Sequence, residues 1–278
     1  MRIPTRGFAA VARAGLIAGV LGAAALVTPA SAAATTVSSN WAGYVAHSPS
    51  GRFTSVSAEW TAPAASCTAG RETHSAVWVG LGGYSTGAKA LEQIGTEADC
   101  GASGQPAYST WVELLPAGAQ NLRLAVRAGD RVVASVTVIG RHATLRLRNL
   151  TTGRSYSTTR RLSAVDVSTA DWIVEAPSGC AAAGGCQTLD LANFGSVSFA
   201  NATATSSGRT RTVADWGGTE LLLRQGRVVS GAAAFRGLGV VSATPSPYDG
   251  GSFSVAYGES EGRAPEGPVL PGFRGGAE

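Results

Sequence analysis

The chain has 278 residues, with 22 Lys and Arg residues against 18 Asp and Glu residues. Three of the basic residues lie within the first 32 positions, and 22 minus 3 leaves 19 basic against 18 acidic residues in the remainder. This near balance excludes the strongly basic proteins that bind nucleic acid or anionic membranes through charge, and we expect neither partner.

The first 32 residues have the pattern of a secretory signal peptide. Basic residues at the start are followed by an apolar run from Ala14 to Val27 and by the small residues Ala30, Ser31 and Ala32. A run of 14 residues is short for a membrane span, and no later stretch is longer and equally apolar. We therefore expect a secreted protein whose mature chain begins at residue 33.

The mature sequence contains short runs in which apolar and polar residues alternate. In chain order these are residues 53–60, 131–139, 143–148, 197–199 and 252–255. Period-two alternation with turn residues between the runs favours antiparallel strands, and no stretch shows helical periodicity over three turns. The prediction is an all-β fold, an antiparallel sandwich or barrel, in one domain over residues 33–257, with a monomer as the default.

The last 21 residues, 258–278, are rich in Gly, Pro and charged residues. Such a composition offers little apolar surface to offset the entropy of ordering the chain. We expect a flexible tail, and a processed or inhibitory extension is the alternative.

Four Cys residues follow the signal peptide. An even number in an exported protein favours disulfides, although four Cys allow three connectivities. The local solution, which we expect, pairs Cys67 with Cys100 and Cys180 with Cys186. A zinc site is disfavoured because the spacings lack the close pairs of a metal knuckle.

Five short segments carry the chemistry of the chain. They are residues 39–43 (SNWAG), 77–80 (VWVG), 91–95 (LEQIG), 111–116 (WVELLP) and 170–175 (ADWIVE). In this order they resemble the glutamic peptidases (eqolisins, peptidase family G1), and the resemblance runs from about Val37 to Tyr257. It implies a concanavalin A-like β-sandwich of two large antiparallel sheets and a secreted acid endopeptidase. It also implies a polypeptide as substrate, and neither a cofactor nor a metal.

The resemblance implies that Gln93 and Glu175 form the catalytic dyad. The Glu175 carboxylate would take a proton from the water that attacks the scissile carbonyl and pass it to the leaving amine. The Gln93 amide would donate to the oxyanion without adding a second negative charge beside Glu175. An ordinary Glu is ionised above about pH 4, which predicts an acidic working range.

Five further residues are candidates for substrate binding. The resemblance places Trp41, Trp78, Trp111 and Glu113 in the segments that line the cleft, and Glu97 is a plausible cleft acid. For Trp41 and Trp78 core packing is the alternative, since Trp in a sandwich is often buried scaffold. For Glu97 the alternative is an exposed surface position.

The sequence departs from the family pattern at two places. Residues 81–84 (LGGY) stand where the family usually has acidic residues, and Ile94 replaces a common Thr.

Two other functions remain as alternatives. One is a non-catalytic module that binds glycans or peptides; the other is a glycoside hydrolase that would use Glu113 and Glu175 as its two carboxylates. His47 and His74 show no sequence spacing typical of a metal motif.

Overall fold

The fold is almost entirely antiparallel β-structure. A computed structural model describes residues 34–180, 185–226 and 239–261. The strands and the one short helix are β1 (Ala34–Ser38), β2 (Trp41–His47), β3 (Ser55–Thr61), β4 (Thr73–Gly82), β5 (Leu91–Cys100), β6 (Pro106–Leu114), β7 (Ala117–Asn121), β8 (Arg131–Ile139), β9 (His142–Asn149), β10 (Ser155–Arg161), β11 (Thr169–Glu175), β12 (Ser178–Cys180), β13 (Cys186–Thr188), β14 (Ser196–Ser206), β15 (Arg209–Thr212), α1 (Val213–Trp216), β16 (Gly218–Gly226), β17 (Gly239–Pro245) and β18 (Phe253–Glu261).

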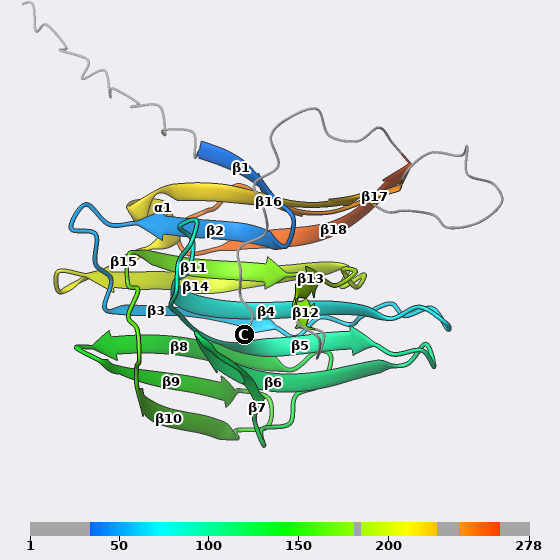
Figure 1. Cartoon of the computed structure of the whole chain (residues 1–278), viewed down its shortest axis with the longest axis horizontal. Coiled ribbons are helices and arrows are strands. Elements are labelled where there is room, and N and C mark those ends of the chain that lie inside the picture. Colours follow the sequence, from blue (N-terminus) through cyan, green and yellow to red (C-terminus); the bar gives the residue numbers. More distant parts are fainter. Residues whose placement is uncertain (1–33, 181–184, 227–238, 262–278) are drawn as a thin grey trace, which may run out of the picture. The chain divides into compact units, whose positions relative to one another are not determined.

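One long hydrogen-bonded sheet contains sixteen of these strands (Figure 1). Its order is β10-β9-β8-β3-β14-β18-β17-β16-β2-β11-β4-β5-β6-β7, with β1 added in parallel to β16 and β15 added to β14. Strands β12 and β13 form a separate small sheet. The expected all-β antiparallel class is confirmed, with the difference that one continuous sheet replaces two separate large ones.

The sheet forms two layers because strands that are far apart in its order pack face to face. Strands β3, β8 and β9 of one layer contact β4 and β5 of the other. The alternating apolar residues of both layers meet in one large core, exemplified by Val56, Val136 and Leu145 on one side and Val79 and Ile94 on the other. Burial of this apolar face holds the layers together.

A second, smaller core lies on the opposite face of β2, β4, β5 and β11. Trp41, Trp78, Leu91 and Ile173 belong to it. Strand β11 is consequently buried along its whole length, on both faces. A strand buried on both faces explains why the segment ADWIVE is nearly continuous in apolar residues rather than alternating.

Both expected disulfides are present, Cys67–Cys100 and Cys180–Cys186. The expected period-two runs fall in β3, β8, β9, β14 and β18. No helix in the part of the chain that the structure describes is long and apolar enough to cross a membrane, and α1 has four residues.

The C-terminal boundary differs from the prediction. Residues 258–261 belong to β18 rather than to a tail, because their backbone pairs with Gly239–Ser242 of β17. Backbone pairing of this kind does not require apolar side chains, which is why composition alone placed the boundary too early. The predicted signal peptide and residues 262–278 lie outside the described residues.

Candidate active site

Adjacent strands bring the family-like segments to one face of the sheet. In the register, Glu175 of β11 lies opposite Trp41 of β2 and Ala76 of β4. Gln93 of β5 lies opposite Gly80 of β4 and Glu113 of β6. Since side chains directly opposite one another in a sheet share a face, five strands contribute to one polar surface beside the smaller core.

Two motif glycines have a packing role in this surface. A Cβ at Gly95 would lie 2.4 Å from the carbonyl oxygen of Val77 and 2.7 Å from the Trp78 Cβ. A Cβ at Gly43, where φ is +137°, would lie 2.1 Å from the carbonyl oxygen of Trp172. Glycine at these positions lets Trp78 and β11 approach their neighbours, which sets the position of the strands that carry the polar residues.

A small cavity of about 90 Å³ opens on this face. Its polar lining contains Gln93, Glu97, Glu113 and Glu175, and the Trp111 side chain also borders it. Gln93 is 1% exposed and Glu175 is 4% exposed, so both are accessible only through the cavity. An amide and three carboxyl groups around one small opening form the arrangement in which proton transfer to a bound molecule can occur.

Several donors hold the Glu175 carboxyl group in place. The Trp78 Nε1 donates a hydrogen bond of 2.7 Å to Oε2, and the Asn40 Nδ2 donates one of 3.3 Å to Oε1. The Ser38 hydroxyl oxygen accepts from the backbone N–H groups of Asn40 and Trp41, which orders the turn that presents Asn40. These donors fix the carboxyl group in one orientation and favour its ionised form.

The electrostatics of the cavity oppose that ionisation. Burial, followed by repulsion from Glu113, raises the pKa of Glu175 to about 8, although hydrogen bonds from Trp41 and Trp78 lower it. Burial likewise raises the pKa of Glu113, against the lowering effect of the Gln93 hydrogen bond. Glu175 therefore does not titrate as the ordinary Glu assumed from the sequence, because it lies beside a second carboxyl group and out of water.

Gln93 is oriented by Glu113. Its Nε2 donates a hydrogen bond of 2.6 Å to Glu113 Oε2 across the β5–β6 pair. A primary amide nitrogen carries two hydrogens, so this bond leaves one N–H for a molecule in the cavity. Gln93 thus lies at the cavity wall with one amide N–H bound to Glu113.

The comparisons with known proteins agree with this geometry. The sequence profile of the Peptidase A4 family matches residues 39–234, well over half of the chain. The chain belongs to this family. The glutamic peptidase resemblance read from the sequence is thereby confirmed, and Gln93, Glu113 and Glu175 all lie within the matched segment.

Single relatives match this chain with low sequence identity or over only part of their length. Aspergillopepsin-2 of Aspergillus niger is 32% identical over 141 residues, which are 49% of this chain and 48% of the relative, so the chain matches about half the length of this curated relative. The crystal structure of scytalido-glutamic peptidase with a peptide-based transition-state analogue superposes with a TM-score of 0.62 and 23% identity, over 79% of this chain and 98% of that one. Aspergilloglutamic peptidase from Aspergillus niger gives a TM-score of 0.51 and 27% identity, over 66% and 99% of the two chains.

The structure divides the candidate binding residues of this glutamic peptidase family member into two groups. Glu97, Trp111 and Glu113 line the cavity. Trp41 and Trp78 are fully buried, with ring centroids 4.9 Å apart. They pack next to Glu175 in the smaller core and are not among the residues that line the cavity. Their contact with the Glu175 carboxyl group suits them to position it.

Sequence reasoning did not single out Asn40, although it lies in the quoted segment SNWAG. An Asn one residue before a predicted strand gives no functional signal in the sequence. Only the 3.3 Å hydrogen bond to Glu175 in the structure distinguishes Asn40. It also did not single out Glu92 and Asp171, which are both fully buried. Burial raises the pKa of Glu92 to about 8 and raises the pKa of Asp171 well above its usual range.

A larger cavity, of about 260 Å³, lies between β6, β7 and the segment that follows β10. Arg160 and Arg161 border it, and none of its lining residues is Asp, Glu, His or Cys. The described residues that line it therefore offer no carboxyl or imidazole group to take up a proton, unlike those that line the smaller cavity.

Proposed function

We propose that the protein is a secreted acid endopeptidase that hydrolyses peptide bonds with water as the nucleophile. The observation that carries the proposal is the joint lining of one cavity by Gln93, Glu113 and Glu175. Membership of the family supports a peptidase, and the relative crystallised with a peptide-based analogue supports a polypeptide as substrate. The signal-like N-terminus and the two disulfides support export.

The proposed reaction needs only the protein's own groups and water. Ionised Glu175 removes a proton from a water molecule as its oxygen bonds to the scissile carbonyl carbon. The free N–H of Gln93 donates to the oxyanion of the tetrahedral intermediate. When the intermediate collapses, the C–N bond breaks and the proton passes from Glu175 to the leaving amine, which returns Glu175 to its ionised form.

The neighbouring carboxyl group determines the pH range. Glu113 and Glu175 repel each other when both are ionised, so they lose their protons in two steps that belong to the pair. Between the two steps the pair carries one negative charge and one proton. We assign the singly ionised form with the charge on Glu175 and the proton on Glu113 to the active enzyme. The pKa of about 8 then describes loss of the second proton of the pair, so the working range lies below it.

The test is cleavage of a denatured protein substrate from about pH 2 to about pH 8, since a pH profile reports the essential acid and base. Wild type should cleave on the acid side, and Glu175→Gln and Gln93→Ala should lose at least about a hundredfold in kcat/KM while staying folded. The matched controls are Glu72→Gln and Gln187→Ala, because both side chains are exposed.

Three results would contradict the proposal: a wild type that is inert at every pH, a Glu175→Gln variant with full activity, or controls that lose as much as the site variants. Inert wild type that still binds peptides would favour a binding module. Release of reducing sugar from a polysaccharide would favour the glycoside hydrolase, because Glu113 and Glu175 lie on the same cavity.

A further inference from the structure

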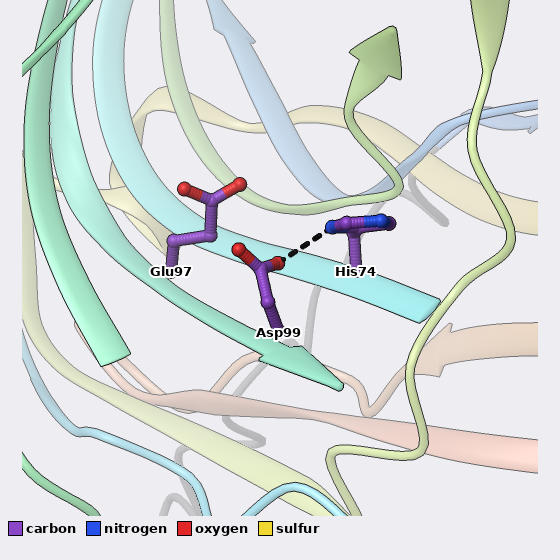
Figure 2. Close-up of side chains that lie close together, drawn as sticks. All are labelled: His74, Glu97 and Asp99. Carbon is purple, nitrogen blue, oxygen red and sulfur yellow. Dashed lines mark hydrogen bonds and ion pairs between the residues drawn. The ribbon is translucent and has the colours of Figure 1, made fainter. Parts of the chain in front are cut away.

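Beside the proposed catalytic cavity, three side chains that the reaction does not need converge on one point. His74 of β4 lies directly opposite Asp99 of β5, and Glu97 lies two residues before Asp99 on the same strand face. One ligand atom from each residue, an imidazole nitrogen or a carboxylate oxygen, lies within 4.8 Å of the other two. Figure 2 shows the three side chains on one face of the paired strands.

We propose that His74, Glu97 and Asp99 bind a divalent cation of the zinc type. One imidazole nitrogen and two carboxylate oxygens are a ligand set that zinc and similar transition-metal ions accept, with water completing the shell. Zn–N and Zn–O bonds are about 2.0–2.2 Å, so ligand atoms around one ion lie about 3–4 Å apart. The three atoms already lie within 4.8 Å of one another, close to that spacing.

The backbone makes this arrangement rigid. Glu97 and Asp99 of β5 are paired with both β4 and β6, and His74 of β4 is paired with β5 and, through an isolated parallel bridge, with Leu191. Backbone pairing on both sides therefore holds the Cα positions of the three residues. The His74 Nδ1 lies 2.9 Å from Asp99 Oδ1, and the Ser109 hydroxyl donates a hydrogen bond of 3.2 Å to Glu97 Oε2. A site whose ligands are already oriented loses little entropy when the ion binds.

The charge of the cluster also favours a cation. Within the described ranges of the chain no Lys or Arg nitrogen lies within 4.0 Å of Glu97 or Asp99, and His74 is the only basic partner of Asp99. The side chains of His74 and Asp99 are 27% and 31% exposed, so an ion can reach them from solvent. When both carboxyl groups are ionised, two negative charges stand with a single imidazole, and a divalent cation would balance them.

This site shares Glu97 with the proposed catalytic cavity. A bound ion would hold the Glu97 carboxylate and place a positive charge at the cavity wall. If the proposed function is correct, zinc and a peptide substrate therefore compete for binding at the Glu97 side of the cavity, and zinc raises the KM for peptide at neutral pH. The binding of zinc itself does not rest on the proposed function.

The experiment measures zinc bound to the mature protein after equilibrium dialysis against excess ZnCl₂ at about pH 8, above the pKa of about 7 of Glu97, because zinc binds deprotonated ligands. The chain contains three His residues, which gives a matched set of variants. We expect one zinc ion per chain for wild type, His47→Ala and His142→Ala. His74→Ala and Asp99→Asn should bind at least about tenfold more weakly, a loss in the range that removed metal partners cause.

Replacement of zinc by Co²⁺ reports the ligands directly through its visible absorption, and this signal should be absent in His74→Ala. Far-UV and near-UV circular dichroism verify that each variant is folded. The inference fails if wild type binds no zinc, if His74→Ala binds as wild type does, or if His47→Ala loses the ion. Zinc that binds without changing KM in an active enzyme would overturn the link to the catalytic cavity.

Discussion

At the scale of single residues, the environment of Glu175 decides its chemistry. A carboxyl group at the end of a buried strand would resist ionisation, and here two indoles and an amide offset part of that cost while Glu113 adds to it. The resulting pKa of Glu175 differs from that of an isolated Glu in water. Each contribution to the difference comes from a residue that can be replaced.

The residue-scale prediction concerns Glu113. Glu113→Gln removes the negative charge but keeps an oxygen that can accept the Gln93 hydrogen bond. The pKa of Glu175 should fall, because its second-largest cause of elevation is gone. Because the variant has one carboxyl group in place of the pair, it lacks the second ionisation step that ends the working range of wild type near pH 8. The alkaline limb of the kcat/KM profile should therefore move to higher pH or disappear.

The control for this shift is Glu59→Gln, a substitution on β3 at a carboxylate that contacts Arg131 instead. Its profile should overlay that of wild type. An alkaline limb that stays near pH 8 or moves to lower pH in Glu113→Gln would show that Glu113 does not repel Glu175 as described.

At the scale of elements, the two disulfides constrain loops of different length. Cys67–Cys100 ties the segment before β4 to the end of β5 and spans 33 residues, whereas Cys180–Cys186 closes the β12–β13 hairpin and spans six. The entropy lost by the unfolded chain grows with loop length, which gives about 4 kcal/mol for the first and about 2 kcal/mol for the second.

The element-scale prediction compares two double variants by urea denaturation. Cys67→Ala/Cys100→Ala should lose more unfolding free energy than Cys180→Ala/Cys186→Ala, by about 1–2 kcal/mol. The first variant should also reduce activity, since β5 carries Gln93 and Glu97. Equal losses, or a larger loss from the shorter loop, would contradict the loop-length argument.

At the scale of the whole molecule, buried carboxyl groups link stability to pH. The pKa of Glu92 is raised from 4.5 to about 8 by burial and by Asp166. Between these values the folded state keeps a proton that the unfolded state has lost, so the free energy of unfolding falls as pH rises. The contribution of protonated Glu92 to the free energy of unfolding is fully present below about pH 4.5 and is lost as the pH rises to about 8.

The whole-molecule prediction is that Glu92→Gln flattens this dependence. The variant should resemble wild type at pH 4 and exceed it by about 3 kcal/mol at pH 7, because an amide cannot ionise. Urea denaturation at both pH values measures the difference, and Glu72→Gln at an exposed site is the control. A Glu92→Gln variant that is less stable than wild type at pH 7 would refute the assignment.

The sequence by itself determined the strand class, the family and the segments that carry Gln93, Glu113 and Glu175. These follow from period-two alternation and from short motifs, and both are local properties of the chain. Local properties also predicted the two disulfide pairs, since each joins the nearest Cys available.

Only the tertiary structure decided how those segments meet. The register of β2, β11, β4, β5 and β6 brought Asn40 to Glu175, oriented Gln93 with Glu113 and set His74 beside Glu97 and Asp99. The partners in these cross-strand contacts are 20 to 135 residues apart, so no short sequence motif links them. The elevated pKa values of Glu92 and Glu175 have the same origin, because burial and repulsion depend on which groups the fold places together.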